Sequence, residues 1–535
     1  MKTKEEIVAN WLPRYTKRSL NDFGEYILLT NFNKYVELFA DKFNVPVLGR
    51  DANMTSAHAE GITIINFGMG SPNAAIIMDL LGAIQPKACL FLGKCVTCVN
   101  GNLTITADAA EMKKVEDIPE SCKEQLPTGQ IRLTAKTAHP GAVIKTLIEK
   151  NKSPKIATLP TFTGGLVGYF SYDYIKYSEP TLKLDAEDQE HFKDVDLMLF
   201  DKVIAYDNYR QKIVLMINIE TENLEENYVK AVQELEKMEE LIRFGKPAET
   251  KAGHLKSEFR PLFDEKAYCE KVEQVKHYIH EGDLFQLVLS NRLEADFEGS
   301  LLDTYRVLRT TNPSPYMFYF SSDDVEIAGA SPETLVKVED GEVRTFPLAG
   351  TRSRGKSYEE DQRLEKELFA DEKERAEHNM LVDLGRNDLG KICDFGTVEV
   401  EKYMSIERYS HVMHIGSTVK GQLRKDKTAV DAIDSVLPAG TLSGAPKLRA
   451  CQIINELENN KRGIYGGAIG YLDFTGNMDT CIAIRLAFKK NGKVFVRSGA
   501  GIVADSVPEK EHQECINKAK AVMVALAEAE GGSNL

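Results

Sequence analysis

The sequence reads Gly440-Thr441-Leu442-Ser443-Gly444-Ala445-Pro446-Lys447 over the eight residues that most constrain its fold. Glycines this dense at the end of a predicted strand let backbone N–H groups approach an anionic ligand closely. Each such stretch is also compatible with an ordinary tight turn. Three further stretches share this character: Pro347-Leu348-Ala349-Gly350-Thr351-Arg352, Tyr465-Gly466-Gly467 and Ser498-Gly499-Ala500-Gly501.

Two pairs of glutamates suggest a metal site. Glu374 and Glu377 are three residues apart in a strongly helical stretch, and Glu511 and Glu514 repeat that spacing at the start of the last predicted helix. Residues three apart share one face of a helix. Two such helices facing each other would present four carboxylates around one point, which suits Mg²⁺. The alternative is that both pairs lie on solvated helix faces.

Two basic side chains stand out beside these motifs. Arg485 follows the apolar run 481–484, so we expect an arginine in an apolar strand. A buried arginine needs a partner, which is either a ligand carboxylate or an internal Asp or Glu. His414 is a candidate general acid or base, and the alternative is a structural histidine.

Length and composition describe an ordinary globular protein. The 535 residues allow two to four domains, and 43% are hydrophobic and 28% charged. No apolar run has the length that a bilayer span requires, and the charged start is unlike a secretory signal, so we expect a cytoplasmic protein without a membrane partner. The net charge of −14 argues against nucleic-acid binding. Cys95 and Cys98 lie in an apolar run and are predicted to be buried thiols rather than a zinc or redox pair.

The spacing of hydrophobic residues predicts strands, helices and a linker along the chain. Short apolar runs predict buried strands at residues 26–29, 62–67 and 88–92, and a glycine-rich turn at 68–73 has the features of a phosphate-binding turn. Strands are predicted at residues 103–106 and 202–206. A charged helix is predicted over 224–244, with an apolar stripe through Val229, Val232, Leu235 and Leu241. A polar linker follows over 245–257, and then an amphipathic helix through Tyr268, Val272, Val275 and Ile279.

Several long motifs resemble one family, the chorismate-utilising enzymes, and within it anthranilate synthase component I. The resemblance runs from about residue 96 to 530. It implies an α+β fold, a large antiparallel β-sheet sandwich with outer helices. The motifs are Phe162-Thr163-Gly164-Gly165, Gly329-Ala330-Ser331-Pro332-Glu333, Leu384-Gly385-Arg386-Asn387-Asp388, Arg408-Tyr409-Ser410-His411-Val412-Met413-His414 and Gly440 through Lys447.

The resemblance also implies roles for individual residues. Glu377 and Glu514 match direct Mg²⁺ ligands, with Glu374 and Glu511 beside them, and His414 matches a histidine implicated in proton transfer. We therefore expect Mg²⁺ as cofactor, Glu377, Glu514 and Glu511 at the metal, and His414, Thr441 and Glu374 in catalysis. Lys518 aligns without an assigned role. The residues that match substrate-binding positions are Gly350, Thr351, Thr441, Tyr465, Arg485, Gly499 and Gly501.

Two positions favour ammonia as the nucleophile. Relatives that add water carry a lysine base where this chain has Gln286, and aminodeoxychorismate synthase usually carries a nucleophilic lysine where this chain has Ala349. The resemblance therefore implies conversion of chorismate and ammonia to anthranilate and pyruvate, with ammonia supplied by a glutamine amidotransferase small subunit. Aminodeoxychorismate synthase component I and an inactive fusion are the alternatives.

The first 95 residues resemble a different protein, the N-terminal part of bacterial AMP nucleosidase, through Asp22 to Asn33 and Ile65 to Ala75. We therefore predict a fusion of a small α/β nucleoside-phosphorylase-like fragment (1–95), a truncated anthranilate synthase N-terminal region (96–255) and a chorismate-binding catalytic domain (256–530). The family's tryptophan feedback site needs a Leu-Leu-Glu-Ser segment that residues 1–95 do not carry, so we expect weak or absent inhibition. The half of that site that remains is Pro315, Tyr316, Met317 and Cys481.

Overall fold

The computed structural model describes residues 26–30, 40–41, 43, 45–47, 56–59, 62–66, 94–107, 112, 121–126, 130–246, 251–408 and 412–530. The chain divides into two compact units, Met1–Gln85 and Pro86–Leu535. Within these described ranges, no helix has both the length and the apolar character needed to cross a bilayer.

The first unit contains a small mixed sheet with the order β1-β3-β2. Strand β1 (Tyr26–Thr30) runs parallel to β3 (Ile62–Asn66), and β2 (Ser56–Ala59) pairs antiparallel with β3. The strands predicted at residues 26–29 and 62–67 are therefore confirmed. The strand predicted at 88–92 and the turn predicted at 68–73 lie outside the described residues.

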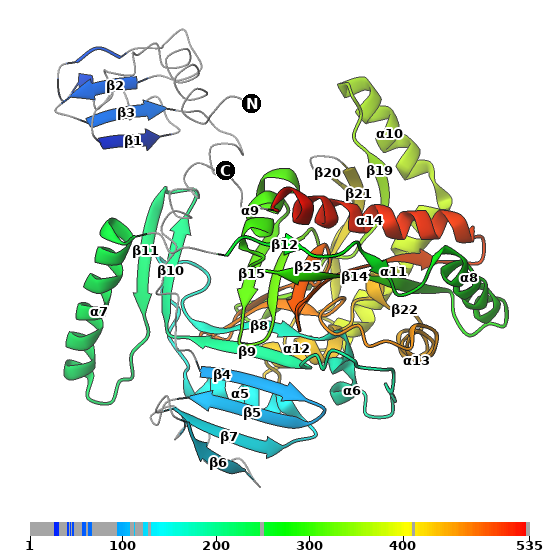
Figure 1. Cartoon of the computed structure of the whole chain (residues 1–535), viewed down its shortest axis with the longest axis horizontal. Coiled ribbons are helices and arrows are strands. Elements are labelled where there is room, and N and C mark those ends of the chain that lie inside the picture. Colours follow the sequence, from blue (N-terminus) through cyan, green and yellow to red (C-terminus); the bar gives the residue numbers. More distant parts are fainter. Residues whose placement is uncertain are drawn as a thin grey trace. The chain divides into compact units, whose positions relative to one another are not determined.

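The second unit is built on two large sheets (Figure 1). All strand pairs within both sheets are antiparallel. The larger sheet contains 13 strands among the described residues. In order these are β19 (Leu348–Ser353), β21 (Val412–Gln422), β18 (Glu342–Thr345), β17 (Thr334–Glu339), β24 (Met478–Ile482), β23 (Ala468–Asp473), β8 (Gly165–Phe170), β9 (Val195–Phe200), β4 (Lys94–Val99), β5 (Asn102–Ala107), β7 (Ile131–Lys136) and β6 (Cys122–Gln125), with β20 (Glu399–Arg408) paired to β21.

The other sheet contains eight strands among the described residues. Its centre is the long pairing of β14 (Gln286–Glu298) with β26 (Lys493–Ile502), which runs in register from Leu287↔Ile502 to Asp296↔Lys493. The remaining strands are β12 (His254–Leu255), β25 (Leu486–Lys490), β16 (Glu326–Ser331), β15 (Tyr316–Ser321), β13 (Arg260–Pro261) and β22 (Gly444–Ala445). A separate two-stranded sheet joins β10 (Lys202–Asp207) to β11 (Lys212–Ile217).

The two large sheets share one buried core. Tyr169, Ile469 and Cys481 of the 13-stranded sheet pack in one cluster with Ile327 and Phe495 of the eight-stranded sheet. A residue of a strand alternates between the two faces of its sheet, so these apolar side chains are the inward-facing half of each strand. The expected α+β fold with large antiparallel sheets is confirmed.

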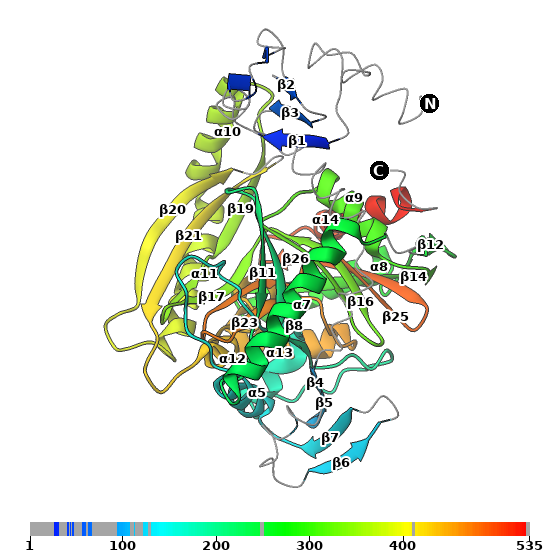
Figure 2. The ribbon, with the colours of Figure 1, turned by 90° about the vertical axis from the view of Figure 1, so that its left-hand side faces the viewer.

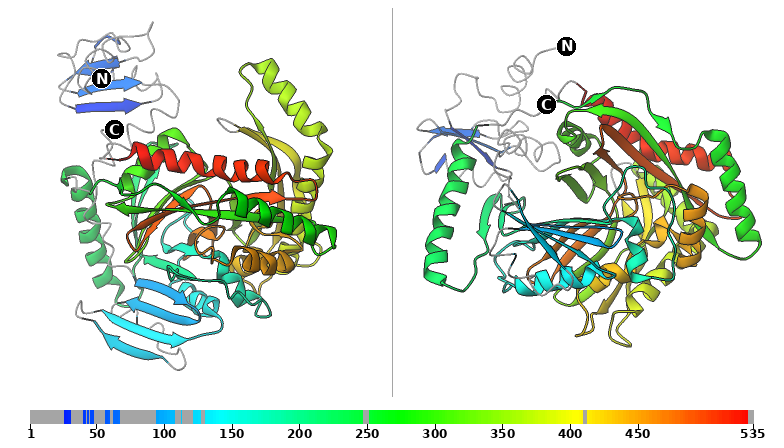
Figure 3. Two further views of the ribbon diagram at one scale, coloured as in Figure 1. Left: turned by 45° about the vertical axis from the view of Figure 1, so that its right-hand side comes forward. Right: turned by 60° about the horizontal axis from the view of Figure 1, so that its bottom comes forward.

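Helices pack against both large sheets. Helices α8 (Glu265–His280), α9 (Leu302–Thr311) and α14 (Pro508–Glu528) lie along the eight-stranded sheet (Figure 3), and α13 (Lys447–Glu458) packs on β14. Helix α11 (Glu372–Gly390) packs on β19 and β21. Figure 2 shows that β19, β20 and β21 extend together toward α10 (Tyr358–Ala370). The other helical segments are α5 (Pro140–Lys150), η2 (Tyr172–Tyr174), α6 (Ile175–Ser178), α12 (Ala429–Val436) and η3 (Gly440–Leu442).

The predicted helices lie where the patterning placed them, with one difference in burial. Helix α7 (Leu224–Phe244) has the predicted bounds, but none of its residues is buried, and Val229 of the predicted stripe is exposed. Helix α8 buries Tyr268, Val272 and Val275 as expected. The predicted linker is only partly irregular, because β12 lies within it and pairs with the end of β14.

Candidate active site

The pairing of β19 with β21 brings His414 against the first glycine-rich stretch. Thr351 and His414 are register partners, and Nδ1 of His414 lies 3.0 Å from the carbonyl oxygen of Gly350 and 3.1 Å from Oγ1 of Thr351. A carbonyl oxygen only accepts, so Nδ1 carries the proton and Nε2 the lone pair of the neutral ring. Burial lowers the pKa of His414, and the charges of Arg485 and Lys518 lower it further, which keeps the ring neutral.

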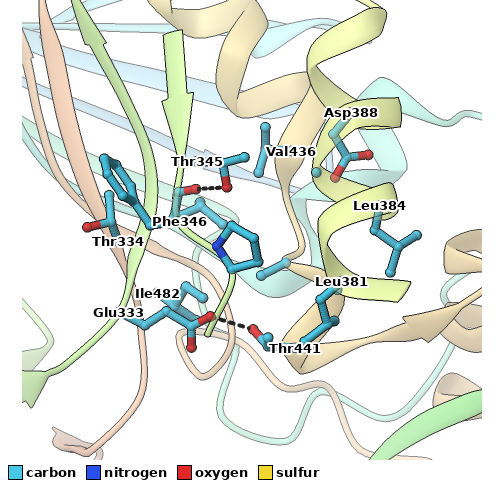
Figure 4. A pocket seen from close by; sticks show the side chains of 15 residues that line it. Glu333, Thr334, Thr345, Phe346, Leu381, Leu384, Asp388, Val436, Thr441 and Ile482 are labelled. Atoms are coloured by element: carbon cyan, nitrogen blue, oxygen red, sulfur yellow. Dashed lines mark hydrogen bonds between the residues drawn. The ribbon is translucent and has the colours of Figure 1, made fainter. Parts of the chain in front are cut away.

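Glu333 is a buried acid that contacts the Thr441 turn. Glu333 connects β16 to β17 and is only 8% exposed, and its Oε1 accepts a hydrogen bond of 3.0 Å from the hydroxyl of Thr441 (Figure 4). Burial raises the pKa of Glu333 to about 8, although the Thr441 hydroxyl and the charge of Lys518 act in the opposite direction. Glu333 is therefore largely a neutral carboxylic acid at pH 7 and can donate a proton.

The prediction that Arg485 lies in a strand was wrong. Strand β24 ends at Ile482 and β25 begins at Leu486, so Arg485 lies in the bend between them, with a left-handed φ of 53°. This conformation is uncommon for a residue with a side chain. The charge of Arg485 acts to lower the pKa of His414. Arg485 is partly buried and pairs with no carboxylate among the described residues, and this burial lowers its pKa. An unpaired guanidinium of this kind suits a ligand carboxylate.

A buried arginine, Arg462, lies beside the ring of Tyr465. The ring of Tyr465 is 3% exposed, and the guanidinium of Arg462 lies 5.9 Å from its centroid. Arg462 also donates to the carbonyl oxygens of Leu442 and Val288 and pairs with Glu458. The Thr441 turn, the start of β14 and Tyr465 are therefore tied to one internal cation.

The four predicted glutamates lie on the two expected helices. Glu374 and Glu377 are on α11, and Glu511 and Glu514 are on α14. Burial raises the pKa of Glu377 and of Glu511, and the nearby carboxylate of the same pair raises each pKa further. The charges of Lys373 and Lys518 both act to lower the pKa of Glu377 and of Glu511.

These glutamates do not form a closed metal site. Within the described ranges, no three His, Cys, Asp or Glu side chains lie close enough to hold a metal ion. Glu514 instead pairs with Lys518 at 2.7 Å, and Glu374 lies 3.4 Å from Arg352. Mg²⁺ needs only one or two protein carboxylates when a substrate and waters supply its other ligands, so this arrangement still fits the ion.

Gln286 occupies the boundary between the glutamates and β26. Its Nε2 donates a hydrogen bond of 2.9 Å to Oε1 of Glu377, while its Oε1 is buried and has no partner among the described residues. A side chain at Gly501 would come within 2.7 Å of Nε2 of Gln286, so only glycine leaves room for this contact. A Cβ at Gly350 would likewise lie 3.2 Å from the Glu374 carboxylate.

Lys518 lies at the centre of the cluster. Its Nζ donates to the carbonyl oxygen of Gly499 at 3.0 Å, and its charge influences the pKa of Glu333, Glu377 and His414. Sequence reasoning left Lys518 and Glu333 without roles. The motif that ends in Glu333 was the available signal, since it places an acid two residues after the end of a fully buried strand.

The predicted feedback residues also come together. The hydroxyl of Tyr316 on β15 donates to Asp479 at 2.7 Å and lies 2.8 Å from Oγ1 of Thr334, whose register partner is Cys481. Met317 is the next residue of β15, and Pro315 precedes that strand.

Comparison with known proteins shows the family of this chain. The family described as chorismate binding enzyme matches residues 107–524. Anthranilate synthase component 1 of Acetivibrio thermocellus is 49% identical over 399 residues, which cover 73% of this chain and 81% of that relative. The crystal structure of anthranilate synthase component I from Streptococcus pneumoniae TIGR4 superposes with a TM-score of 0.66 at 38% identity, covering 80% of this chain and 89% of that one. The chain therefore belongs to the anthranilate synthase component 1 family of chorismate binding enzymes.

A second, partial match accompanies the first. AMP nucleosidase from Bacteroides thetaiotaomicron VPI-5482 is 47% identical to this chain, with a TM-score of 0.14, over 22% of this chain and 53% of the nucleosidase.

Proposed function

We propose that this chain binds chorismate in the cluster around Lys518 and converts it, with ammonia, to anthranilate and pyruvate. The observation that carries this proposal is Gln286, whose amide bonds Glu377 and leaves a buried carbonyl oxygen without a partner. An amide does not take up a proton, so Gln286 does not activate water, whereas its free oxygen accepts a hydrogen bond from ammonia. Ala349, with no nucleophilic group, favours the same reaction over that of aminodeoxychorismate synthase.

Chorismate has two carboxylates, and the site offers a cation for each. Arg485 pairs with the enolpyruvyl carboxylate through two parallel N–H groups, and Tyr465 borders the same region. The backbone of Gly499 and Gly501, the Thr441 hydroxyl, and the strand segment of Gly350 and Thr351 form the remaining walls. Mg²⁺, when bound by Glu377 and Glu514 with Glu374 and Glu511 nearby, supplies a Lewis acid for the ring carboxylate.

Glu333 and His414 move the protons. Ammonia adds at C2 as the C4 hydroxyl leaves, and Glu333 donates the proton that converts this hydroxyl to water. The surplus proton of the new C2 ammonium group returns to the Glu333 carboxylate. Thr441 orients Glu333 through its hydrogen bond, and His414 presents the lone pair of Nε2 for proton transfer near the leaving hydroxyl. Loss of the C2 proton with elimination of pyruvate then makes the ring aromatic.

A second subunit supplies the ammonia in this proposal. The component 1 name of the relatives implies a component II, and a glutamine amidotransferase is the partner that generates ammonia. A cytoplasmic location, the domain ranges 1–95, 96–255 and 256–530, the outer-helix sandwich and the nucleoside-phosphorylase-like character of the N-terminal fragment stay predictions of the sequence.

Product analysis tests the reaction. Purified chain with chorismate, Mg²⁺ and ammonium should give anthranilate and pyruvate in equal amounts when the mixture is separated by chromatography. Aminodeoxychorismate without pyruvate would support the alternative synthase. A folded protein that leaves chorismate unchanged would indicate an inactive fusion.

A further inference from the structure

Two buried arginines share one glutamate between α13 and β26. Glu458 is the last residue of α13, and its carboxylate pairs with Arg462 at 2.6 Å and with Arg497 of β26 at 2.7 Å. All three side chains are at most 3% exposed. Burial raises the pKa of Glu458, but the charges of the two arginines outweigh this effect and hold the pKa below its usual value. These residues therefore form an ionised arginine–glutamate triad.

The two arginines of the triad differ in their remaining hydrogen bonds. A buried ion triad adds little net stability by itself, because the lost hydration of the charges offsets most of their attraction. Arg497 directs its other donors to polar groups in its own surroundings, which are Ser290, Asn460 and Lys461. Arg462 instead directs two hydrogen bonds out of the triad, toward the proposed site.

The guanidinium of Arg462 cross-links the Thr441 turn to β14. Its Nη1 donates to the carbonyl oxygen of Leu442 at 2.5 Å, and its Nη2 donates to that of Val288 at 2.7 Å. The N–H of Val288 donates to the carbonyl oxygen of Ser443 at 2.9 Å. Leu442 directly follows Thr441 in η3, so the cross-link fixes the segment that carries the Thr441 hydroxyl.

This hydroxyl donates the hydrogen bond of 3.0 Å to Glu333 that is drawn in Figure 4. We propose that Arg462 is a positioning residue that holds the Thr441 hydroxyl against the carboxyl group of Glu333 through the carbonyl oxygen of Leu442. The inference rests on the proposed function, because Glu333 acts there as the proton donor. Arg462 bonds the turn and β14 rather than Glu333 itself, so it acts through Thr441.

Loss of the Thr441 hydrogen bond would change the protonation of Glu333 in a predictable direction. Burial is the largest influence on the pKa of Glu333, and it raises this pKa. Three groups oppose burial and favour the ionised form, namely the Thr441 hydroxyl from η3, the Lys518 ammonium from α14 and the backbone of Leu348 from β19. An arginine that positions Thr441 therefore keeps the pKa of Glu333 lower than it would be without this hydrogen bond.

Infrared titration of the whole chain without substrate tests the inference. The protonated carboxyl band that disappears in Glu333→Gln reports the protonation of Glu333 directly. Arg462→Lys keeps a charge beside Glu458 but lacks the planar fork that reaches two carbonyl oxygens. The midpoint of the band should rise by about half to one pH unit, as in Thr441→Val. Adding Arg462→Lys to Thr441→Val should raise the midpoint no further, because both substitutions remove the same hydrogen bond.

Arg497→Lys is the matched control. It also removes guanidinium hydrogen bonds from the triad and should lower the thermal stability of the chain, as Arg462→Lys does. Among the described residues, however, Arg497 donates no hydrogen bond to the Thr441 turn, so the midpoint should stay at its original value. A folded Arg462→Lys with an unchanged midpoint, or an equal rise in Arg497→Lys, would overturn the inference.

A second variant decides the question if Arg462→Lys does not fold. Arg462→Met combined with Glu458→Leu and Arg497→Met replaces the whole triad by apolar side chains, an exchange that buried ion triads often tolerate. This variant also removes the donor to Leu442, so the same rise is expected, and an unchanged midpoint would contradict the inference. If the midpoints move as expected in a chain that forms no anthranilate, the positioning of Thr441 is supported and only the proposed function fails.

Discussion

The amide of Gln286 donates a hydrogen bond of 2.9 Å to the carboxylate of Glu377. This bond joins the first residue of β14 to the second turn of α11, and so connects the nucleophile's side of the proposed site to the predicted metal's side. The hydrogen bond joins a neutral amide to an acidic side chain. In the proposed reaction the Gln286 amide takes no proton from ammonia, and Glu377 remains an anion that binds the metal.

Gln286→Lys should impair the use of ammonia. The lysine ammonium would form an ion pair with Glu377 and occupy the place from which ammonia attacks, so we expect anthranilate formation to fall by about 100-fold. Some chorismate should now react with water, and chromatography of the products would reveal a hydroxylated compound. Gln189→Lys places the same charge at an exposed position and should retain full activity. Undiminished anthranilate formation by Gln286→Lys would contradict the role of the amide.

Glu333→Gln should remove the proton donor. A general acid contributes about 10²–10⁴ to the rate, so kcat should fall within that range. Because burial raises the pKa of Glu333 to about 8, the protonated form that the reaction needs is present below pH 8 and is lost as the pH rises through it. The rate profile of the unmodified chain should therefore decline above about pH 8. Glu367→Gln, on the exposed face of α10, should preserve both rate and profile. A normal kcat in Glu333→Gln would exclude Glu333 as the acid.

Arg485→Lys should weaken substrate binding. Lysine keeps the charge but loses the planar pair of N–H groups that matches a carboxylate, so we expect KM for chorismate to rise about tenfold or more with a smaller change in kcat. Steady-state kinetics over a range of chorismate concentrations would measure both constants. The same exchange at exposed Arg386 should change neither, and a KM equal to that of the unmodified chain would argue against the assignment of Arg485.

Tryptophan should inhibit the chain weakly or not at all. The family resemblance implies that Pro315, Tyr316, Met317 and Cys481 form one half of a feedback site, whereas residues 1–95 do not carry the Leu-Leu-Glu-Ser segment expected for the other half. Rates measured against increasing tryptophan, beside a relative that carries this segment, would test the expectation. Equal inhibition of the two proteins would show that tryptophan binds without the segment.

The sequence predicted the parts of the site that follow from periodicity. Helices α11 and α14 present Glu374, Glu377, Glu511 and Glu514 at the expected spacing, because three-residue spacing is a property of any helix. The family resemblance supplied the residues of β19, β21 and β26 that surround them.

The features that the sequence did not predict correctly depend on tertiary structure. Arg485 follows an apolar run, yet its left-handed φ turns it out of the strand, and hydrophobicity alone does not reveal a backbone angle. The raised pKa of Glu333 comes from its burial between packed segments, which no local pattern records. Of the predicted stripe of α7, only Val229 is exposed, and Val232, Leu235 and Leu241 are half-buried in a helix that packs on β11.

Anthranilate fluorescence under a Mg²⁺ titration tests the central claim most directly. Purified chain with chorismate and ammonium should form anthranilate only when Mg²⁺ is present, and chelation should abolish the signal. Glu514→Gln should need much more Mg²⁺ or remain inactive, whereas Glu509→Gln, exposed in the first turn of the same helix, should behave as the unmodified chain does. Anthranilate formation that is indifferent to Mg²⁺ and to Glu514, or no anthranilate from a folded chain, would contradict the account.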